Sequence, residues 1–295
     1  MSEPTLLVVP EAGIPSPPKE VDQILDATGV DLDPWQRSFL DHALARAPDG
    51  RWSAFEVGLV VPRQNGKNAI LEIRQLLGLF TLGERLAVHS AHDFKTAQEH
   101  HRRLVGLVEA SPWMSKRVKT IRWAHGSEAI ELKNGCRIRF LARSRSTGRG
   151  FTADSLYFDE AFRLDSEMVG GVLPILSARR DPQMWVVSSA PQHQSEYLHS
   201  LLGRADSGGD GRLLVAEWGN PQDTELDDQT AWARANPALG IRISFEHVEA
   251  ELKALGGTLM GQAEFRRERL GIRDQFGDAE WETFDEAMWE AVTSA

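Results

Sequence analysis

A strand–turn–helix pattern between residues 57 and 80 constrains the fold of this 295-residue chain more than any other feature. The apolar run 57–61 has the length of a strand buried on both faces, and residues 69–80 have helical periodicity. The turn between them, 62–68, contains Gly66-Lys67. Backbone N–H groups of such a turn, together with the helix N-terminus, form an anion cradle. The pattern therefore predicts a phosphate-binding loop at the end of a parallel strand.

The residues of this turn have distinct expected roles. Lys67 would reach the β and γ phosphates of a nucleotide, and Gly66 lets the backbone approach them closely. Two positions depart from the common pattern, because Val61 stands in place of the first glycine and Asn68 in place of a Ser or Thr. An Asn oxygen can still approach Mg²⁺, directly or through water. We therefore expect the nucleotide to be bound by Pro62, Gln64, Asn65, Gly66, Lys67 and Asn68. The alternative is a surface turn with a chance Gly-Lys.

Two adjacent carboxylates follow the apolar strand 155–158, about ninety residues after the phosphate loop. In a nucleotide-binding α/β sheet the carboxyl end of such a strand faces the bound nucleotide. Asp159 would then hold Mg²⁺ through water, and Glu160 would orient and polarise the attacking water. Alone, the pair would be an ordinary solvated turn. A strand at 86–90 separates the two motifs, as in ATPases that do mechanical work.

Strands and helices alternate along most of the chain. Further buried strands are expected at 86–90, 184–188 and 212–216, and Asn134-Gly135 indicates a hairpin. After residue 220 the strand signal stops, and helices are expected at 227–235, 245–255 and 259–270. This organisation predicts an α/β fold of the P-loop NTPase class. Its parts are a mostly parallel central sheet flanked by helices, an inserted β-hairpin and a small C-terminal helical lid subdomain.

The composition is that of a globular chain with an acidic balance. The net charge is −10, which argues against a passive nucleic-acid coat. Twelve Lys and Arg but only three acids lie between Arg102 and Arg149, so a local basic face is expected, with a solvated charged surface as the alternative. The only cysteine, Cys136, is expected to be a small buried side chain and fits a reducing compartment. No apolar run is long enough to span a membrane.

Five motifs in a fixed order resemble those of the large terminase family of tailed bacteriophages, over residues 30–275. Arg63 to Asn68 is similar to the family's variant phosphate loop, with an Arg four residues before the Lys. The family's Gly-Arg-Gly-Phe and Asp-Glu-Ala motifs match residues 148–151 and 159–161. Residues 188–191, Ser-Ser-Ala-Pro, resemble the motif that couples hydrolysis to movement. The remaining two matches are the glutamine motif at Trp35-Gln36, which reads adenine, and the lid sequence 235–240.

The resemblance implies an ATPase that uses ATP and Mg²⁺ and translocates double-stranded DNA into a procapsid. Its implied partners are the portal protein, a small terminase subunit and further copies of itself in a ring, in the host cytoplasm. It implies catalytic roles for Lys67, Glu160, Arg63 and Arg149, the last as an arginine finger, with Trp35, Gln36 and Ser189 at the nucleotide. Arg149 lies in a loop rich in Gly, Ser and Arg, so a DNA phosphate is its alternative partner.

The expected domain organisation is an N-terminal arm at 1–30, the ATPase domain at 31–218, the lid at 219–275 and a linker at 276–295. A nuclease follows the ATPase in this family. We expect none here, because no apolar strand ending in Asp occurs after residue 275.

Three other functions remain open at this stage. They are a helicase-like DNA translocase, a phosphotransferase, and a DNA-binding protein with a degenerate loop that does not turn over. Asn68 favours the last. The neighbouring histidines 89, 92, 100 and 101 lack a matching Cys or acid in the sequence, so a metal site there is not expected.

Overall fold

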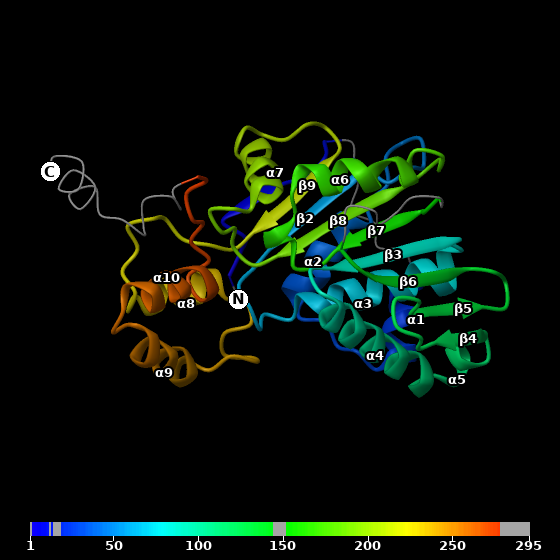
Figure 1. Ribbon diagram of the computed structural model, residues 1–295, viewed down its shortest axis with the longest axis horizontal. Coiled ribbons are helices and arrows are strands. Elements are labelled where there is room, and N and C mark those ends of the chain that lie inside the picture. The colour runs from blue at the N-terminus through cyan, green and yellow to red at the C-terminus, as the bar shows by residue number, and fades with distance from the viewer. Residues whose placement is uncertain (1, 12, 14–18, 144–151, 278–295) are drawn as a thin grey trace, which may run out of the picture.

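The computed structural model describes residues 2–11, 13, 19–143 and 152–277, and it contains a nine-stranded sheet with the order β1-β9-β2-β8-β7-β3-β6-β5-β4 (Figure 1). The six strands from β9 to β6 run parallel, and β1, β4 and β5 are antiparallel to their neighbours. This confirms the expected mostly parallel sheet. The strands are β1 (Leu6–Val8), β2 (Glu56–Val60), β3 (Leu86–Ala91), β4 (Val118–Arg122), β5 (Ala129–Leu132), β6 (Arg137–Ala142), β7 (Ser155–Phe158), β8 (Gln183–Ser188) and β9 (Leu213–Glu217).

Both faces of this sheet are buried, because alternate strand residues enter two separate apolar clusters. In β8, Trp185 and Val187 join one cluster, whereas Met184 and Val186 join the other. Period-2 alternation with apolar residues on both faces explains why the parallel strands read as continuous apolar runs.

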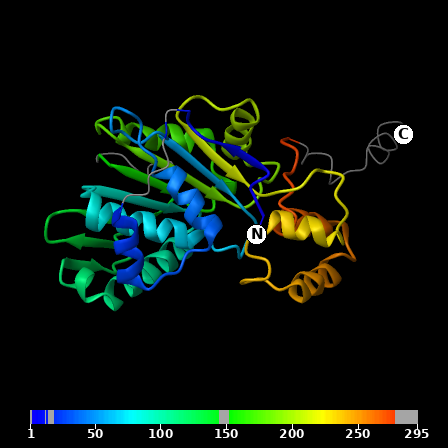
Figure 2. The same cartoon turned by 180° about the vertical axis from the view of Figure 1, so that it is seen from behind.

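Helices cover each face of the sheet (Figures 1 and 2). One face carries α1 (Lys19–Thr28), α2 (Pro34–Ala43), α3 (Lys67–Leu77) and α4 (Phe94–Ala110), followed by the short α5 (Pro112–Ser115). The other carries α6 (Ser166–Val172) and α7 (Glu196–Asp206). Short irregular turns complete the body at η1 (Gly78–Leu82), η2 (Ala161–Arg163) and η3 (Leu173–Leu176).

The lid consists of α8 (Gln229–Ala235), α9 (Phe245–Leu255) and α10 (Leu259–Glu268), at the end of the molecule opposite the β4–β5 hairpin (Figure 1). It has its own small core, which includes Trp232, Val248 and Phe265. The chain enters the lid beside Gly219 and leaves it beside Gly271. A Cβ built on Gly219 would lie 2.5 Å from the Gly271 carbonyl oxygen, so the absence of a side chain lets the two connections touch.

Two elements near the N-terminus were not foreseen from the sequence. An N-terminal arm was expected over residues 1–30, but Leu6–Val8 forms the edge strand β1 beside β9. Helix α1 places Val21 and Ile24 fully inside the larger apolar cluster. The Pro-rich composition around both elements hid them. The domain boundaries at 30, 218 and 275 remain predictions.

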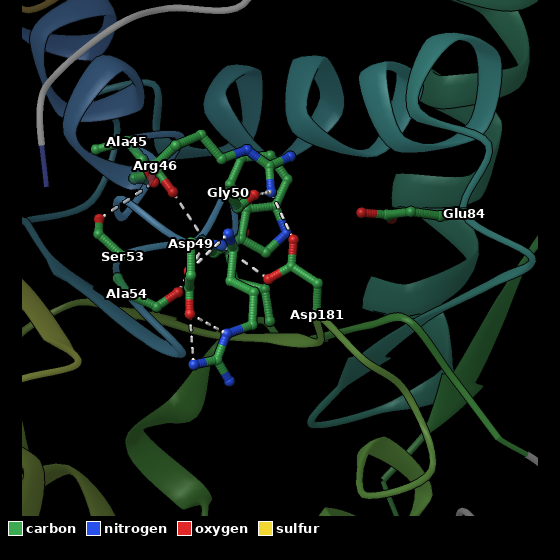
Figure 3. A network of polar contacts seen from close by, with 12 residues as sticks. Ala45, Arg46, Asp49, Gly50, Ser53, Ala54, Glu84 and Asp181 are labelled. Carbon is green, nitrogen blue, oxygen red and sulfur yellow. Dashed lines mark hydrogen bonds and ion pairs between the residues drawn. The ribbon is translucent and has the colours of Figure 1, made fainter.

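Polar contacts connect the segments at the amino ends of the strands. Arg46 binds Asp181 and lies over the Trp52 ring, which ties the loop between α2 and β2 to the turn before β8 (Figure 3). The fully buried Arg74 of α3 forms an ion pair of 2.7 Å with Glu84. The described part of the chain contains no helix long and apolar enough to cross a membrane.

Candidate nucleotide-binding site

A cavity of about 550 Å³ opens at the carboxyl ends of the central strands. The phosphate loop, the acidic pair and the residue after β8 all contribute to it. Its lining residues are Arg63, Gln64, Gly66, Lys67, Asn68, Ala69, Thr96, Arg103, Asp159, Glu160, Phe162, Ser189 and Arg242. The fold thus brings together segments that the sequence separates by up to about 180 residues.

Backbone strain is concentrated in this cavity. Among the described residues other than glycine, only Gln64 (φ 68°) and Glu160 (φ 50°) have a left-handed backbone. Both line the cavity. Such conformations cost about 1–3 kcal/mol each and persist where the surrounding structure enforces them, most often at functional sites.

Gly66 ends the loop and caps α3 with φ 90°, which favours glycine. A Cβ at this position would also lie 2.7 Å from the Gln36 side-chain nitrogen. Lys67 is the first residue of α3, where the helix N-terminus favours anions. Desolvation lowers the pKa of Lys67, while the carboxylates of Asp159 and Glu268 oppose the shift. The cradle therefore combines a helix terminus with a poorly solvated cation.

Asp159 is buried at the end of β7, and one of its oxygens accepts the Glu160 backbone N–H at 2.9 Å. Burial raises the pKa of Asp159 to about 6, against the opposing charge of Lys67. Arg143 braces this turn from below, because its guanidinium donates to the carbonyl oxygens of Asp159 (2.6 Å) and Glu160 (3.4 Å). The Arg143 side chain therefore points inward, toward the acidic pair.

Glu160 is held by a residue that the sequence analysis did not single out. The Thr96 hydroxyl donates to the Glu160 carboxylate at 3.3 Å. Thr96 lies in the first turn of α4, where Asp93 caps the helix by accepting its backbone N–H. The contact links the acidic pair to the N-terminus of α4.

Three arginines line the cavity, and only Arg63 was expected there. Arg63 pairs with Glu268 of the lid at 3.1 Å. Arg103 pairs with the buried Glu72 of α3 at 2.7 Å. Arg242 of the lid forms an ion pair with Asp33, the residue that caps α2. The signals for the last two were weak, because one Arg in a helix and one in a loop carry no motif of their own.

Four residues assigned to nucleotide binding, Trp35, Gln36, Pro62 and Asn65, lie outside the set that lines the cavity. Gln36 is fully buried. Its oxygen accepts the Asp33 backbone N–H at 2.7 Å, and its nitrogen donates to the Gly66 carbonyl at 2.7 Å. Gln36 thus braces the phosphate loop. Trp35 packs edge-on against Trp218.

Asn65 faces the lid instead of the cavity. Its nitrogen donates to the Asn236 side-chain oxygen at 3.0 Å, and its oxygen accepts the Ala238 backbone N–H at 3.0 Å. The sequence had predicted that Asn65 binds the nucleotide. The lid residues 236–238, far away in sequence, take both of its polar groups.

The remaining predicted residues are distributed as follows. Lys67, Asn68, Asp159, Glu160 and Ser189 all line the cavity, as do Arg63, Gln64 and Gly66. Ser188, which precedes Ser189, is buried at the end of β8. Arg149 and the motif at 148–151 lie outside the described residues.

No protein-family model and no curated protein sequence matches the chain. Solved structures do. The large terminase of bacteriophage HK97 superimposes with a TM-score of 0.75 at 19% identity, over 86% of this chain and 55% of that one. The ATPase domain of the Thermus phage P74-26 large terminase gives 0.56 at 16% identity, over 88% and 99%. A large terminase from a thermophilic bacteriophage, in complex with ADP, gives 0.55 at 13% identity, over 82% and 53%.

The fold is therefore that of the ATPase part of phage large terminases, as the sequence resemblance predicted. The chain spans about half of the HK97 protein, 55% of its length, and nearly all of the isolated P74-26 domain. At sequence identities of 13% to 19%, the likeness to these structures defines the fold alone.

Proposed function

We propose that this chain is the ATP-hydrolysing motor of phage DNA packaging and moves double-stranded DNA into a procapsid through the portal. The observation that carries this proposal is one cavity that unites Lys67, Asp159 and Glu160 at the carboxyl ends of a parallel sheet. The likeness to terminase ATPase folds, one of them solved with ADP, supports it.

Each residue has a chemical role in this proposal. Lys67 and the N-terminus of α3 neutralise charge on the β and γ phosphates. Glu160 orients a water for in-line attack on the γ-phosphorus. The Thr96 hydroxyl holds the Glu160 carboxylate in the nucleotide-free state. Arg63 is released from Glu268 to meet charge that develops on the transferred group.

The donor set fits a hard divalent cation, because a buried carboxylate and an amide oxygen face the same cavity as Lys67. Asp159 and Asn68 would hold Mg²⁺, which when bound neutralises phosphate charge. Burial raises the pKa of Asp159 to about 6, which is still below neutral pH, so most of the carboxylate is ionised there.

DNA is the proposed macromolecular substrate, and the edge of the sheet formed by β4, β5 and β6 is its proposed contact. The exposed basic residues there are Lys116, Arg117, Lys119, Arg122, Lys133 and Arg137. Portal protein, small terminase subunit, a ring of copies and the host cytoplasm follow from the same proposal.

Hydrolysis is tested by phosphate release with and without DNA. Lys67→Ala removes the cation at the phosphates, and its activity should fall to background. The matched control Lys95→Ala, on the exposed surface of α4, should retain wild-type activity. Glu160→Gln should bind ATP, but its rate of hydrolysis should fall by more than about tenfold, which corresponds to about 1.4 kcal/mol of activation free energy. Normal turnover by Lys67→Ala would refute the phosphate-loop assignment.

Asn68 supports a second candidate, a nucleotide-dependent DNA-binding protein that does not turn over. It lacks the hydroxyl that usually contacts the metal. Asn68→Ser separates the two. A motor should keep or gain activity with Ser. A protein without turnover should bind ATP and release no phosphate in either form.

Arg149 is proposed to act on the nucleotide of a neighbouring subunit. Arg149→Ala and Glu160→Gln subunits should each be nearly inactive alone. A mixed ring contains some interfaces with both residues intact, so partial activity should return. No recovery in verified mixed assemblies would place Arg149 in its own subunit or on DNA.

A further inference from the structure

A buried polar relay lies behind Asp159, made of three side chains from three elements. Gln75 of α3 forms hydrogen bonds to both His89 of β3 and His100 of α4. Its nitrogen is 3.1 Å from His89 Nδ1, and its oxygen is 2.8 Å from His100 Nε2. All three side chains are at most 2% exposed. Polar groups buried this deeply are costly unless their hydrogen bonds are satisfied, so the relay is a constrained arrangement.

One nitrogen of the relay faces the acidic pair. His89 Nε2 lies 4.0 Å from an Asp159 carboxylate oxygen, and it has no hydrogen-bond partner among the described residues. The other Asp159 oxygen accepts the Glu160 N–H. His89 Nε2 and Asp159 Oδ2, the oxygen that does not accept the Glu160 N–H, therefore face each other across 4.0 Å.

The contact with Gln75 fixes which His89 nitrogen carries the proton. The Gln75 side-chain nitrogen lies 3.1 Å from Nδ1 and can only donate, so Nδ1 is the acceptor. The ring hydrogen is then on Nε2, the nitrogen that faces the Asp159 carboxylate. The Gln75 oxygen consequently accepts from His100 Nε2–H.

A shared metal ion is the obvious alternative use of His89, His100 and Asp159, whose ligand atoms lie within 4.8 Å of one another. The ring geometry opposes it. The two imidazoles are stacked in parallel, with an interplanar angle of 2° and a centroid distance of 4.0 Å. A histidine ligand directs its lone pair in the ring plane. An ion between the two stacked rings would lie out of both ring planes, where neither lone pair points.

We infer that His89 is a positioning residue whose Nε2–H faces Asp159 across 4.0 Å and orients its carboxylate toward the cation of the nucleotide site. The relay His100–Gln75–His89 fixes the donor and ties it to α3, the helix that begins at Lys67, and to α4, the helix that carries Thr96. Partners that hold a metal-binding carboxylate commonly change metal affinity by 10–100-fold when removed. This inference rests on the proposed role of Asp159.

Two substitutions of matched polarity separate positioning from packing. His89→Gln places an amide nitrogen near the position of Nε2, within reach of Asp159. His89→Asn places its amide near Nδ1, where it meets Gln75 but not Asp159. Mg²⁺ affinity, measured by titrating the cation against a fluorescent nucleotide, should fall about tenfold in His89→Asn and less than about twofold in His89→Gln. Nucleotide affinity without Mg²⁺ should be unchanged in both.

A spectroscopic measurement on the unsubstituted protein does not depend on the folding of a variant or on turnover. The ¹⁵N shifts of labelled His89 distinguish a protonated from an unprotonated ring nitrogen, and they should show Nε2–H with Nδ1 unprotonated. In Asp159→Asn this preference should weaken, because an amide can also donate. A protonated Nδ1 in the unsubstituted protein would overturn the inference. Equal loss of Mg²⁺ affinity in the two His89 variants would also overturn it and indicate packing alone.

The two proposals fail in different ways. If the protein binds no Mg²⁺-nucleotide, the proposed function fails, whatever the state of His89. If it binds Mg²⁺-nucleotide and hydrolyses it but His89 carries its proton on Nδ1, the relay inference fails alone.

Discussion

The sheet body and the lid are held together by different forces. The body buries two large apolar clusters on opposite faces of the sheet. The lid buries one small cluster around Trp232 and Phe265. It is joined to the body through two touching backbone connections at Gly219 and Gly271 and through polar contacts at the nucleotide cavity. Apolar burial of this extent makes the body one cooperative unit, whereas a few hydrogen bonds and ion pairs can be exchanged at low cost.

This contrast suits the proposed function, in which the nucleotide site opens and closes. The lid side chains Asn236, Arg242 and Glu268 all contact the phosphate loop or its supports. A nucleotide that competes for Arg63 or moves the loop at Asn65 therefore acts on the lid directly. The body is the rigid part, and it holds Asp159 and Glu160 at a strand end while the lid moves.

The largest expected effect is on the body. Glu84→Ala leaves the fully buried Arg74 without its counter-charge and should lower the free energy of unfolding by about 3–5 kcal/mol in urea titrations. The double variant Arg74→Met with Glu84→Met should recover most of this loss. In the lid, Glu249→Ala breaks an exposed pair with Lys253 and should cost no more than about 0.5 kcal/mol. Comparable costs at both sites would contradict the contrast.

A core substitution in the lid should act locally. Trp232 packs edge-on against Phe265 and donates its ring N–H to the Leu226 carbonyl at 2.8 Å. Trp232→Ala should cost about 3–5 kcal/mol of lid stability. Hydrogen exchange should then accelerate in α8, α9 and α10, while β2, β7 and β8 keep their protection. A uniform loss of protection would show that lid and body unfold as one unit.

Asp159 should reduce the stability of the body at neutral pH. Burial raises the pKa of Asp159 from 3.8 to about 6, so the folded state favours the protonated form. The contribution of Asp159 to stability is then highest below about pH 4, falls as pH rises toward 6, and is constant above it. Without nucleotide or Mg²⁺, Asp159→Asn should raise the free energy of unfolding at pH 7.5 by up to about 3 kcal/mol and change it little at pH 4. An equal change at both pH values would refute this origin.

The last prediction concerns the hydrogen bonds of Asn65 that connect the phosphate loop to the lid. Asn65→Ala removes the contacts to Asn236 and Ala238 and should favour lid opening by about 1–3 kcal/mol. Exchange in α8 to α10 should increase, and nucleotide affinity should fall. Asn65→Asp keeps the acceptor for the Ala238 N–H, so it should have an intermediate effect. Unchanged lid exchange in Asn65→Ala would mean that Arg63 and Arg242 suffice to hold the lid.

Local pattern was sufficient for the fold class and for the centre of the site. Apolar runs of strand length, each followed by a helix, predicted the parallel strands because burial on both faces leaves a continuous apolar sequence. Gly66-Lys67 and Asp159-Glu160 each stand at a strand end, so the geometry of parallel sheets predicted that they meet. The elements β1 and α1 lie beside a Pro-rich segment, which hid their apolar patterns.

The sequence by itself determined the alternation of strands and helices, the Gly66-Lys67 turn and the Asp159-Glu160 pair. Each of these features depends on residues that are close along the chain. Only the tertiary structure decided that Gln36 braces Gly66, that Arg143 turns inward, and that Asn65 holds a lid residue 171 positions away. The choice among the possible partners of a polar side chain depends on which groups the fold buries beside it. Unpaired buried groups are costly, so the packed structure selects the partner.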